Sequence, residues 1–94
     1  MEFEWDNAKA AANFRKHKVT FDEASTVFSD RLARIFDDEG HSAEERREII
    51  VGHSILNRLL LVCFTECGAD TVRIFSARRA TRKEREDYEE NTSR

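Results

Sequence analysis

The chain has 94 residues and a net charge of −3, with 37% charged and 39% hydrophobic residues. Its longest unbroken apolar run, Leu59–Phe64, is far shorter than the roughly 20 residues of a membrane-spanning helix. This excludes a spanning helix, and because the N-terminal residues hold no apolar stretch typical of a signal peptide, we expect a cytoplasmic protein in which residues 1–94 form one domain.

The N-terminal residues predict a short strand followed by a helix. Phe3–Trp5 is typical of a strand, and Asp6 or Asn7 can cap a helix that runs to about His17. On this helix Phe14 and His17 share the face that we expect to be buried.

A second, shorter helix is predicted directly afterwards. Thr20 and Glu23 have the spacing of a capping box, in which each side chain bonds the backbone N–H of the other residue. Phe21, Ala24 and Phe28 form its apolar stripe.

The second half of the chain is typical of strands. Strands are predicted at Ala33–Asp37, Glu48–Ser54, Leu59–Glu66 and Thr71–Ala77. A turn is expected at Asp38–His41, and Ser42 with Glu45 forms another capping box before the second of these strands. The apolar run from Leu59 indicates a central strand that is covered on both faces.

The last predicted element is a helix capped by Thr81 and Glu84 that runs to about Glu90. The element order predicts an α+β fold, with helices gathered on one face or edge of the sheet. Two N-terminal helices should pack against a mainly antiparallel four-stranded sheet, with one further helix at the C-terminus.

Charge is segregated along the chain. Between Asp22 and Glu48 there are nine acids against four arginines, whereas Arg73–Arg85 contains six bases against one acid. A chain with this distribution can bind an anion at one end although it is acidic overall.

Several fragments, in this order and spacing, resemble the BrnT-type toxins of bacterial type II toxin–antitoxin modules. They are FEWD at 3–6, KHKVTFDEA at 16–24, VFSD at 27–30, HSAEERR at 41–47, VGHS at 51–54, NRLLLV at 57–62 and RIFSARRATRKEREDYE at 73–89. The resemblance implies a RelE-like fold, metal-independent endoribonuclease activity that inhibits translation and growth, and no cofactor. It also implies a cognate antitoxin of the ribbon-helix-helix class, so that promoter DNA is contacted only through the toxin–antitoxin complex.

The sequence departs from the family pattern at three positions. Lys18 and Asn57 stand where the family usually has glycine, and Phe75 where isoleucine is common. Asparagine tolerates a positive φ, whereas Lys18 would be strained if the backbone there is left-handed.

Metal-free RNA cleavage uses the substrate's 2′-hydroxyl as nucleophile, and it needs an acid–base group and cations for the charge on the phosphate. Histidine titrates near neutral pH, and arginine clamps a phosphate with a planar fork of donors. The expected catalytic residues are His17, Arg58 and Arg78. Further RNA- or phosphate-binding residues are expected at Lys16, Arg73, Arg79 and Arg82.

The acid–base assignment stays open at this point. His17 can equally be a half-buried histidine on its helix face, and His53 or Glu45 can take the acid–base role instead. His41 is more typical of a turn residue, because a capping box follows it.

The two arginines near the end of the last strand also have alternatives. Arg73 can form an internal ion pair with Glu48 or Glu66. A regular strand places Arg73 and Arg78 on opposite faces, so both reach one site only if the strand ends or bulges near Ser76.

Two other functions compete with the ribonuclease hypothesis. A binding module of the same scaffold could inhibit its target by occupancy, without cleaving RNA. A DNA-binding subunit is disfavoured, because the sequence has no helix-turn-helix or basic recognition helix.

Overall fold

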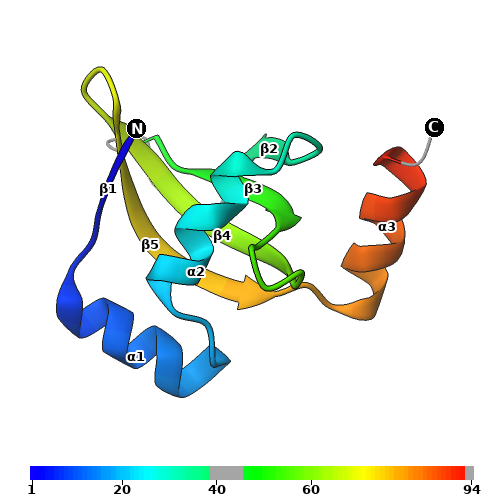
Figure 1. Ribbon diagram of the computed structural model, residues 1–94, viewed down its shortest axis with the longest axis horizontal. Helices are drawn as coiled ribbons and strands as arrows, with labels where there is room; N and C mark the ends of the chain where they lie inside the picture. The colour runs from blue at the N-terminus through cyan, green and yellow to red at the C-terminus, as the bar shows by residue number, and fades with distance from the viewer. Residues whose placement is uncertain (39–45, 93–94) are drawn as a thin grey trace.

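The computed structural model describes residues 1–38 and 46–92, whose arrangement is drawn in Figure 1. Its elements in chain order are β1 (Glu2–Glu4), α1 (Asn7–His17), α2 (Phe21–Thr26), the 3₁₀ helix η1 (Val27–Ser29), β2 (Arg34–Asp37), β3 (Glu48–His53), β4 (Leu59–Cys67), β5 (Thr71–Arg79) and α3 (Arg82–Thr92). The predicted α+β class is confirmed. No helix in these two ranges is long and apolar enough to cross a membrane.

The sheet has five strands and is mixed, so the prediction of a mainly antiparallel four-stranded sheet was wrong in the number of strands. Its order is β1-β5-β4-β3-β2, in which β2 to β5 form an antiparallel meander and β1 joins β5 in parallel. Phe3 lies opposite Val72 in this added pair, and Glu2 N–H donates to the Asp70 carbonyl over 2.8 Å. A contact between residues so far apart in sequence leaves no local signal.

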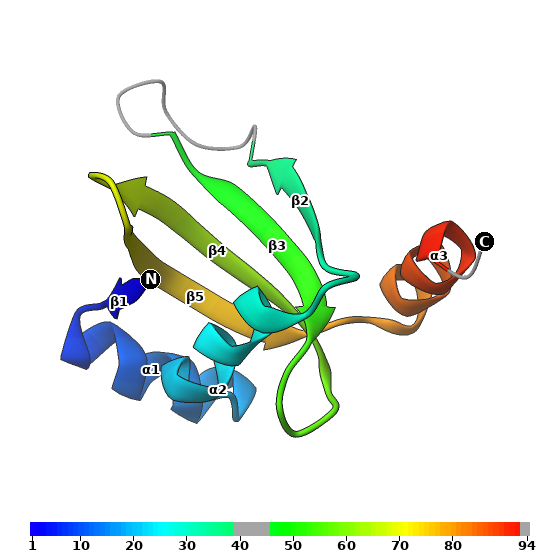
Figure 2. The same ribbon diagram turned by 45° about the horizontal axis from the view of Figure 1, so that its top comes forward.

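Helices pack on both faces of the sheet and are not gathered on one face or edge, as the sequence suggested. Figure 2 shows α1 and α2 together on one side, with α3 at the opposite end of the molecule. Because neighbouring residues of a strand point to opposite faces, Ile50 of β3 joins the core under α1 and α2 while Val51 faces the other way. There Val51 and Leu59 pack against the buried Tyr88 of α3.

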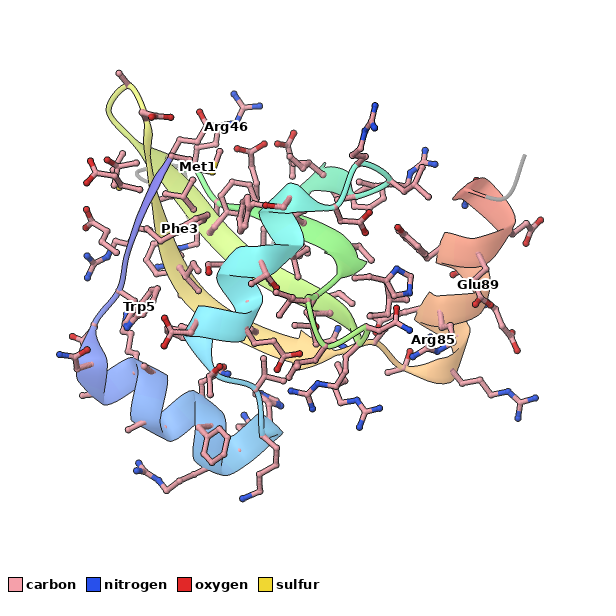
Figure 3. All side chains as sticks on the ribbon, in the orientation of Figure 1. Met1, Phe3, Trp5, Arg46, Arg85 and Glu89 are labelled. Atoms are coloured by element: carbon pink, nitrogen blue, oxygen red, sulfur yellow. The ribbon has the colours of Figure 1, made fainter. Side chains whose placement is uncertain are left out.

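The main core lies between α1, α2 and the sheet. Its buried residues are Val19, Phe21, Ala24, Val27, Ile50, Leu60, Val62, Phe64, Val72, Ile74 and Ala77. Phe3 and Trp5, at the start of the chain in Figure 3, pack at its margin. The Trp5 ring meets Phe21 edge-on, with 5.8 Å between centroids. The first strand is therefore tied to the core by aromatic packing as well as by its backbone.

The buried face of α1 differs from the expected one. Phe14 is 46% exposed, whereas the polar Asn13 is buried. Asn13 occupies the buried position because its amide satisfies backbone groups of two neighbouring segments, as described below.

Side-chain caps fix the helix starts near the predicted positions. Asp6 accepts hydrogen bonds from the backbone N–H groups of Ala8 and Lys9 at the start of α1. At α3 the box is reciprocal, since Thr81 Oγ1 accepts from Glu84 N–H and Glu84 Oε1 accepts from Thr81 N–H.

The capping box predicted at Thr20 and Glu23 is only half formed. Thr20 Oγ1 accepts from Glu23 N–H over 3.0 Å, but the Glu23 carboxylate binds Ser54 and Arg58 instead of returning to Thr20. The capping box predicted at Ser42 and Glu45 lies outside the described residues.

Two non-glycine residues adopt a left-handed backbone. They are Lys18, with φ 59°, and Asn57, with φ 60°. Lys18 ends α1, and its N–H donates to the Phe14 carbonyl. The turn after α1 thus has the geometry that glycine favours, which confirms the strain expected for a lysine there.

We therefore expect Lys18→Gly to raise the free energy of unfolding by about 0.5–1 kcal/mol. A left-handed conformation costs an L-residue about 1–2 kcal/mol, of which the greater freedom of glycine in the unfolded chain offsets a part. Urea unfolding measures the change. The same substitution at Lys16, inside α1, is the control and should lower stability. A Lys18→Gly protein no more stable than wild type would contradict the strain argument.

Candidate functional site

A bulge in β5 determines which arginines share a face of the sheet. Cys63 of β4 lies opposite Ser76, and the next residue, Phe64, lies opposite Ile74, so Phe75 has no counterpart. Ile74 and Ala77 both face the main core although three positions separate them. The bulge therefore places Arg73 and Arg78 on the same face of the sheet, away from the core. This is the outcome expected if the strand bulges near Ser76.

A cleft of about 160 Å³ lies beside this bulge, at the C-terminal end of α1. It is lined by His17, Asp38, Ile49, Leu61, Cys63, Ser76, Ala77 and Arg78. Two of the expected catalytic residues, His17 and Arg78, thus come together from elements that are far apart in the sequence. This cleft is the candidate active site.

Asn13 fastens α1 to the strand that carries Arg78. Its amide nitrogen donates to the carbonyls of Ala77 (2.8 Å) and Val19 (3.0 Å), and its amide oxygen accepts from Ala77 N–H (3.0 Å). β1 pairs with β5 only as far as Arg73. The Asn13 side chain thus pairs with the β5 backbone beyond that point as a neighbouring strand would, and it fixes His17 one turn further along α1.

Arg78 is held by a carboxylate of α3. Its two terminal nitrogens donate to the two oxygens of Glu84, each over 2.8 Å, and one of them also donates to the Arg79 carbonyl. The hydrogen bonds from Arg78 lower the pKa of Glu84 to about 2 against the opposing effect of burial, and the same pairing raises the pKa of Arg78. The guanidinium has five N–H donors, so this fork orients the group and leaves donors for a phosphate.

His17 is the last residue of α1 and is half-buried. Arg15, Lys16 and His17 form a basic last turn, which the negative end of the helix dipole favours. Lys16 is exposed beside the cleft-lining histidine. Arg78 lines the cleft and Lys16 lies beside it, and positive charge there suits an anionic substrate.

Arg58 does not reach the cleft. The partly buried Arg58 side chain lies against the buried Glu23, whose carboxylate accepts hydrogen bonds from the Arg58 guanidinium and from Ser54 Oγ. Arg58 also donates to the Lys18 carbonyl. The hydrogen bonds from Arg58 lower the pKa of Glu23, although burial opposes them. This cluster joins α2 to the β3–β4 hairpin, so the geometry gives Arg58 a structural role.

The remaining expected phosphate binders are spread over the surface. Arg73 forms an internal ion pair over 2.7 Å, as one alternative predicted, but its partner is Glu4 of β1 and not Glu48 or Glu66. Arg82 makes an exposed pair with Glu86 on α3. Arg79 is exposed and lies near Glu23, since its charge contributes to lowering the pKa of that carboxyl.

His53 belongs to a different cluster. Its backbone N–H donates to Asp30 Oδ2 over 2.7 Å, and its ring meets that of Tyr88 edge-on at 5.7 Å. Burial acts to raise the pKa of Asp30, but hydrogen bonds led by the His53 N–H outweigh it and lower the pKa. The other acid–base candidate, Glu45, and the expected turn residue His41 lie outside the described residues.

Three polar side chains of the cleft, Asp38, Cys63 and Ser76, were not expected there from the sequence. Asp38 stands just after β2, and the Cys63 thiol lies 3.5 Å from its carboxylate. Nothing in the sequence indicated that Cys63 lies in a cleft, and Ser76 was expected only as a place for the bulge. No sequence signal identifies them, because they reach the cleft through sheet pairing. Within residues 1–38 and 46–92, no three His, Cys, Asp or Glu side chains gather so as to hold a metal ion.

Known proteins resemble this chain in sequence and in fold. Residues 5–84 match the family model of the ribonuclease toxin BrnT of type II toxin–antitoxin systems. The fold is similar to the crystal structure of the BrnT ribonuclease toxin of Brucella abortus, with a TM-score of 0.67 and 23% identity over 87% of this chain and 99% of that one. A search of the curated proteins gave no match.

Replacing Asn13 tests the support of the cleft. We expect Asn13→Ala to lower the free energy of unfolding by about 2–4 kcal/mol, because it leaves buried backbone groups of Ala77 and Val19 without partners. Denaturant unfolding measures this loss. Asn7→Ala, at the exposed start of the same helix, is the matched control and should change stability by no more than about 0.5 kcal/mol. Equal effects of the two substitutions would contradict the assigned role.

Proposed function

The chain belongs to the BrnT family of ribonuclease toxins of type II toxin–antitoxin systems, and from this premise we propose that it is a metal-independent endoribonuclease. In this proposal it acts in the cytoplasm, cleaves RNA and so inhibits translation and growth. The observation that carries the proposal is the cleft in which His17 of α1 and Arg78 of β5 lie together.

The proposed reaction uses the RNA itself as the source of the nucleophile. The 2′-hydroxyl attacks the adjacent phosphorus and loses its proton, the bond to the 5′-oxygen of the next nucleotide breaks, and that oxygen takes up a proton. A 2′,3′-cyclic phosphate and a free 5′-hydroxyl result. The reaction needs proton transfer and stabilisation of the negative phosphorane, and neither requirement demands a metal ion.

His17 is the proposed acid–base residue and Arg78 the proposed phosphate ligand. The imidazole stands at the cleft edge on a helix whose position Asn13 fixes, and Glu84 fixes the guanidinium. A cation already oriented before the substrate binds needs little reorganisation as charge develops, which is the source of electrostatic catalysis. Lys16 adds positive charge along the path of the RNA backbone.

The partner proposed for this chain is a ribbon-helix-helix antitoxin, and promoter DNA is bound only by the complex. Family membership implies an antitoxin. Three of the six bases in Arg73–Arg85 have ion-pair partners within the chain. The other three have none among the described residues: Arg79, Lys83 and Arg85. Acidic antitoxin side chains can pair with these bases and block access of RNA to the neighbouring cleft.

Purified protein incubated with total RNA in the presence of EDTA should produce RNA fragments, because no step of the proposed reaction uses a metal. Arg78→Ala should lower the cleavage rate about 100- to 1,000-fold, as expected when one preorganised donor is lost. His17→Ala should also lower it strongly. Arg31→Ala, which removes an exposed arginine away from the cleft, is the control and should cleave at the wild-type rate.

Because Arg78→Ala leaves Glu84 without its main partner, Arg78→Lys provides a second variant that keeps the positive charge but loses the planar fork. Circular dichroism confirms that each variant is folded. Wild-type cleavage by a folded Arg78→Ala protein excludes Arg78 from the site. Growth inhibition by wild-type protein that leaves RNA intact would favour inhibition by occupancy instead.

Hydrogen exchange with and without the antitoxin tests where the partner binds. We expect added protection within Arg73–Tyr88, because the unpaired bases and the cleft arginine lie there. Protection confined to Asp22–Glu48 would show that the antitoxin inhibits from another surface.

The rate of association with the antitoxin should fall in part with added salt, since exposed charges steer the encounter over about 10 Å at 0.1 M ionic strength.

A further inference from the structure

The edge strand β2 exposes large apolar side chains at the margin of the sheet. Ile35 and Phe36 are 53% and 52% exposed, and Leu32 just before the strand is 62% exposed. In the part of the chain that the structure describes, no strand pairs with the outer edge of β2. An exposed edge with apolar side chains is a template for another strand, and proteins usually protect such edges with charge or cover them.

The pairing of β2 with β3 determines which backbone groups this edge offers. Arg34 lies opposite Val51 and Phe36 opposite Ile49, and Asp38 N–H donates to the Arg47 carbonyl in the same register. In an antiparallel pair, hydrogen-bonded residues alternate with residues whose backbone groups point outward. The N–H and C=O groups of Arg34, Phe36 and Asp38 therefore face β3, whereas those of Ile35 and Asp37 face the free edge.

We propose that β2 of a second copy of this chain pairs with this edge, antiparallel and about a two-fold axis. Only registers that bring outward-facing residues opposite one another are possible. In the register centred on Phe36, Ile35 of each copy pairs with Asp37 of the other, and each such pair exchanges two backbone hydrogen bonds. The two Phe36 rings then lie opposite one another, and Arg34 of each copy lies opposite Asp38 of the other.

Charge selects this register over its neighbours. A register centred on Ile35 puts Arg34 opposite Phe36, and a register centred on Asp37 puts the two Asp37 carboxylates together. The register centred on Phe36 instead gives an aromatic pair and two Arg34–Asp38 pairs, the cross-strand contacts that stabilise sheets. The sequence from Arg34 to Asp38 is thus complementary to its own antiparallel copy, as a two-fold interface requires.

This dimer would extend the candidate cleft across the two copies. A two-fold axis perpendicular to the sheet keeps the same face of both sheets on one side, so both clefts open in the same direction. Asp38 lines the cleft, so Arg34 of the second copy would stand at its rim and add a cation there. The dimer itself does not depend on ribonuclease activity and can be tested without it.

The interface has the size of a reversible contact. β2 has four residues, and a single short strand with its side chains buries less surface than the roughly 1,200 Å² typical of stable complexes. The free protein should therefore interconvert between monomer and dimer as its concentration changes.

Sedimentation velocity of the full chain over a wide concentration range tests the proposal. We expect wild-type protein to shift from monomer to dimer, and Ile35→Pro to raise the dimer dissociation constant about tenfold or more. Proline at this position removes an N–H that points to the free edge, and the pairing with β3 stays intact. Edge strands tolerate proline at such positions. Circular dichroism and thermal unfolding show whether the variant is folded.

A charge exchange tests the register independently of proline. Arg34→Asp and Asp38→Arg should each weaken the dimer, and the double variant should restore the wild-type dissociation constant. Wild-type protein that stays monomeric at every concentration would overturn the proposal, as would a folded Ile35→Pro protein that dimerises normally. Failure of the double variant to recover would overturn the register. Protection of β2 from hydrogen exchange only when the antitoxin is added would assign this edge to the antitoxin instead.

Discussion

The pairing between the Asn13 amide and the backbone of Ala77 is the contact on which the candidate site depends. The Asn13 side chain pairs with β5 as a neighbouring strand would, because it satisfies the N–H and the C=O of Ala77, which β1 is too short to reach. Both groups are buried, so the bond is costly to break and the helix has little freedom to slide along the strand. The positions of His17 and Arg78 relative to each other follow from this one side chain.

The arginines that looked alike in the sequence have different physical roles. Arg58 has its guanidinium against the buried carboxylate of Glu23, where removal of either partner would leave an uncompensated charge. Arg73 joins the two strands at the β1 edge through Glu4, in an exposed pair of little energetic weight. Arg78 alone combines an orienting carboxylate with a position in the cleft. Burial and partners distinguish these roles, and neither is visible in the residue type.

α3 is tied to the rest of the molecule by Tyr88 and to the cleft by Glu84. Tyr88 anchors the helix, since its ring is buried against Val51 and Leu59 and its hydroxyl donates to the Leu32 carbonyl over 3.1 Å. One turn earlier, Glu84 binds Arg78. In Figure 3, Arg85 and Glu89 belong to the same helix, most of whose surface is charged. A partner that moves α3 would therefore also move the carboxylate that orients the cleft arginine.

The sequence by itself determined the local structure of this protein. Side-chain caps at Asp6 and Thr81, the turn at Lys18 and the apolar run of β4 depend on neighbouring residues, so each was predicted close to its observed position. The family was also indicated by the sequence, because its fragments recur in a fixed order and spacing.

The tertiary structure alone decided the pairing of the first strand with β5, the face on which α3 lies and the composition of the cleft. Each depends on pairing between segments far apart in the chain, such as Glu2–Glu4 with Thr71–Arg73. The bulge at Phe75 shows the reason most clearly, since one extra residue reverses the faces of all residues beyond it. Whether Arg73 and Arg78 share a face is therefore a property of the register between two strands, and no pattern within either strand specifies it.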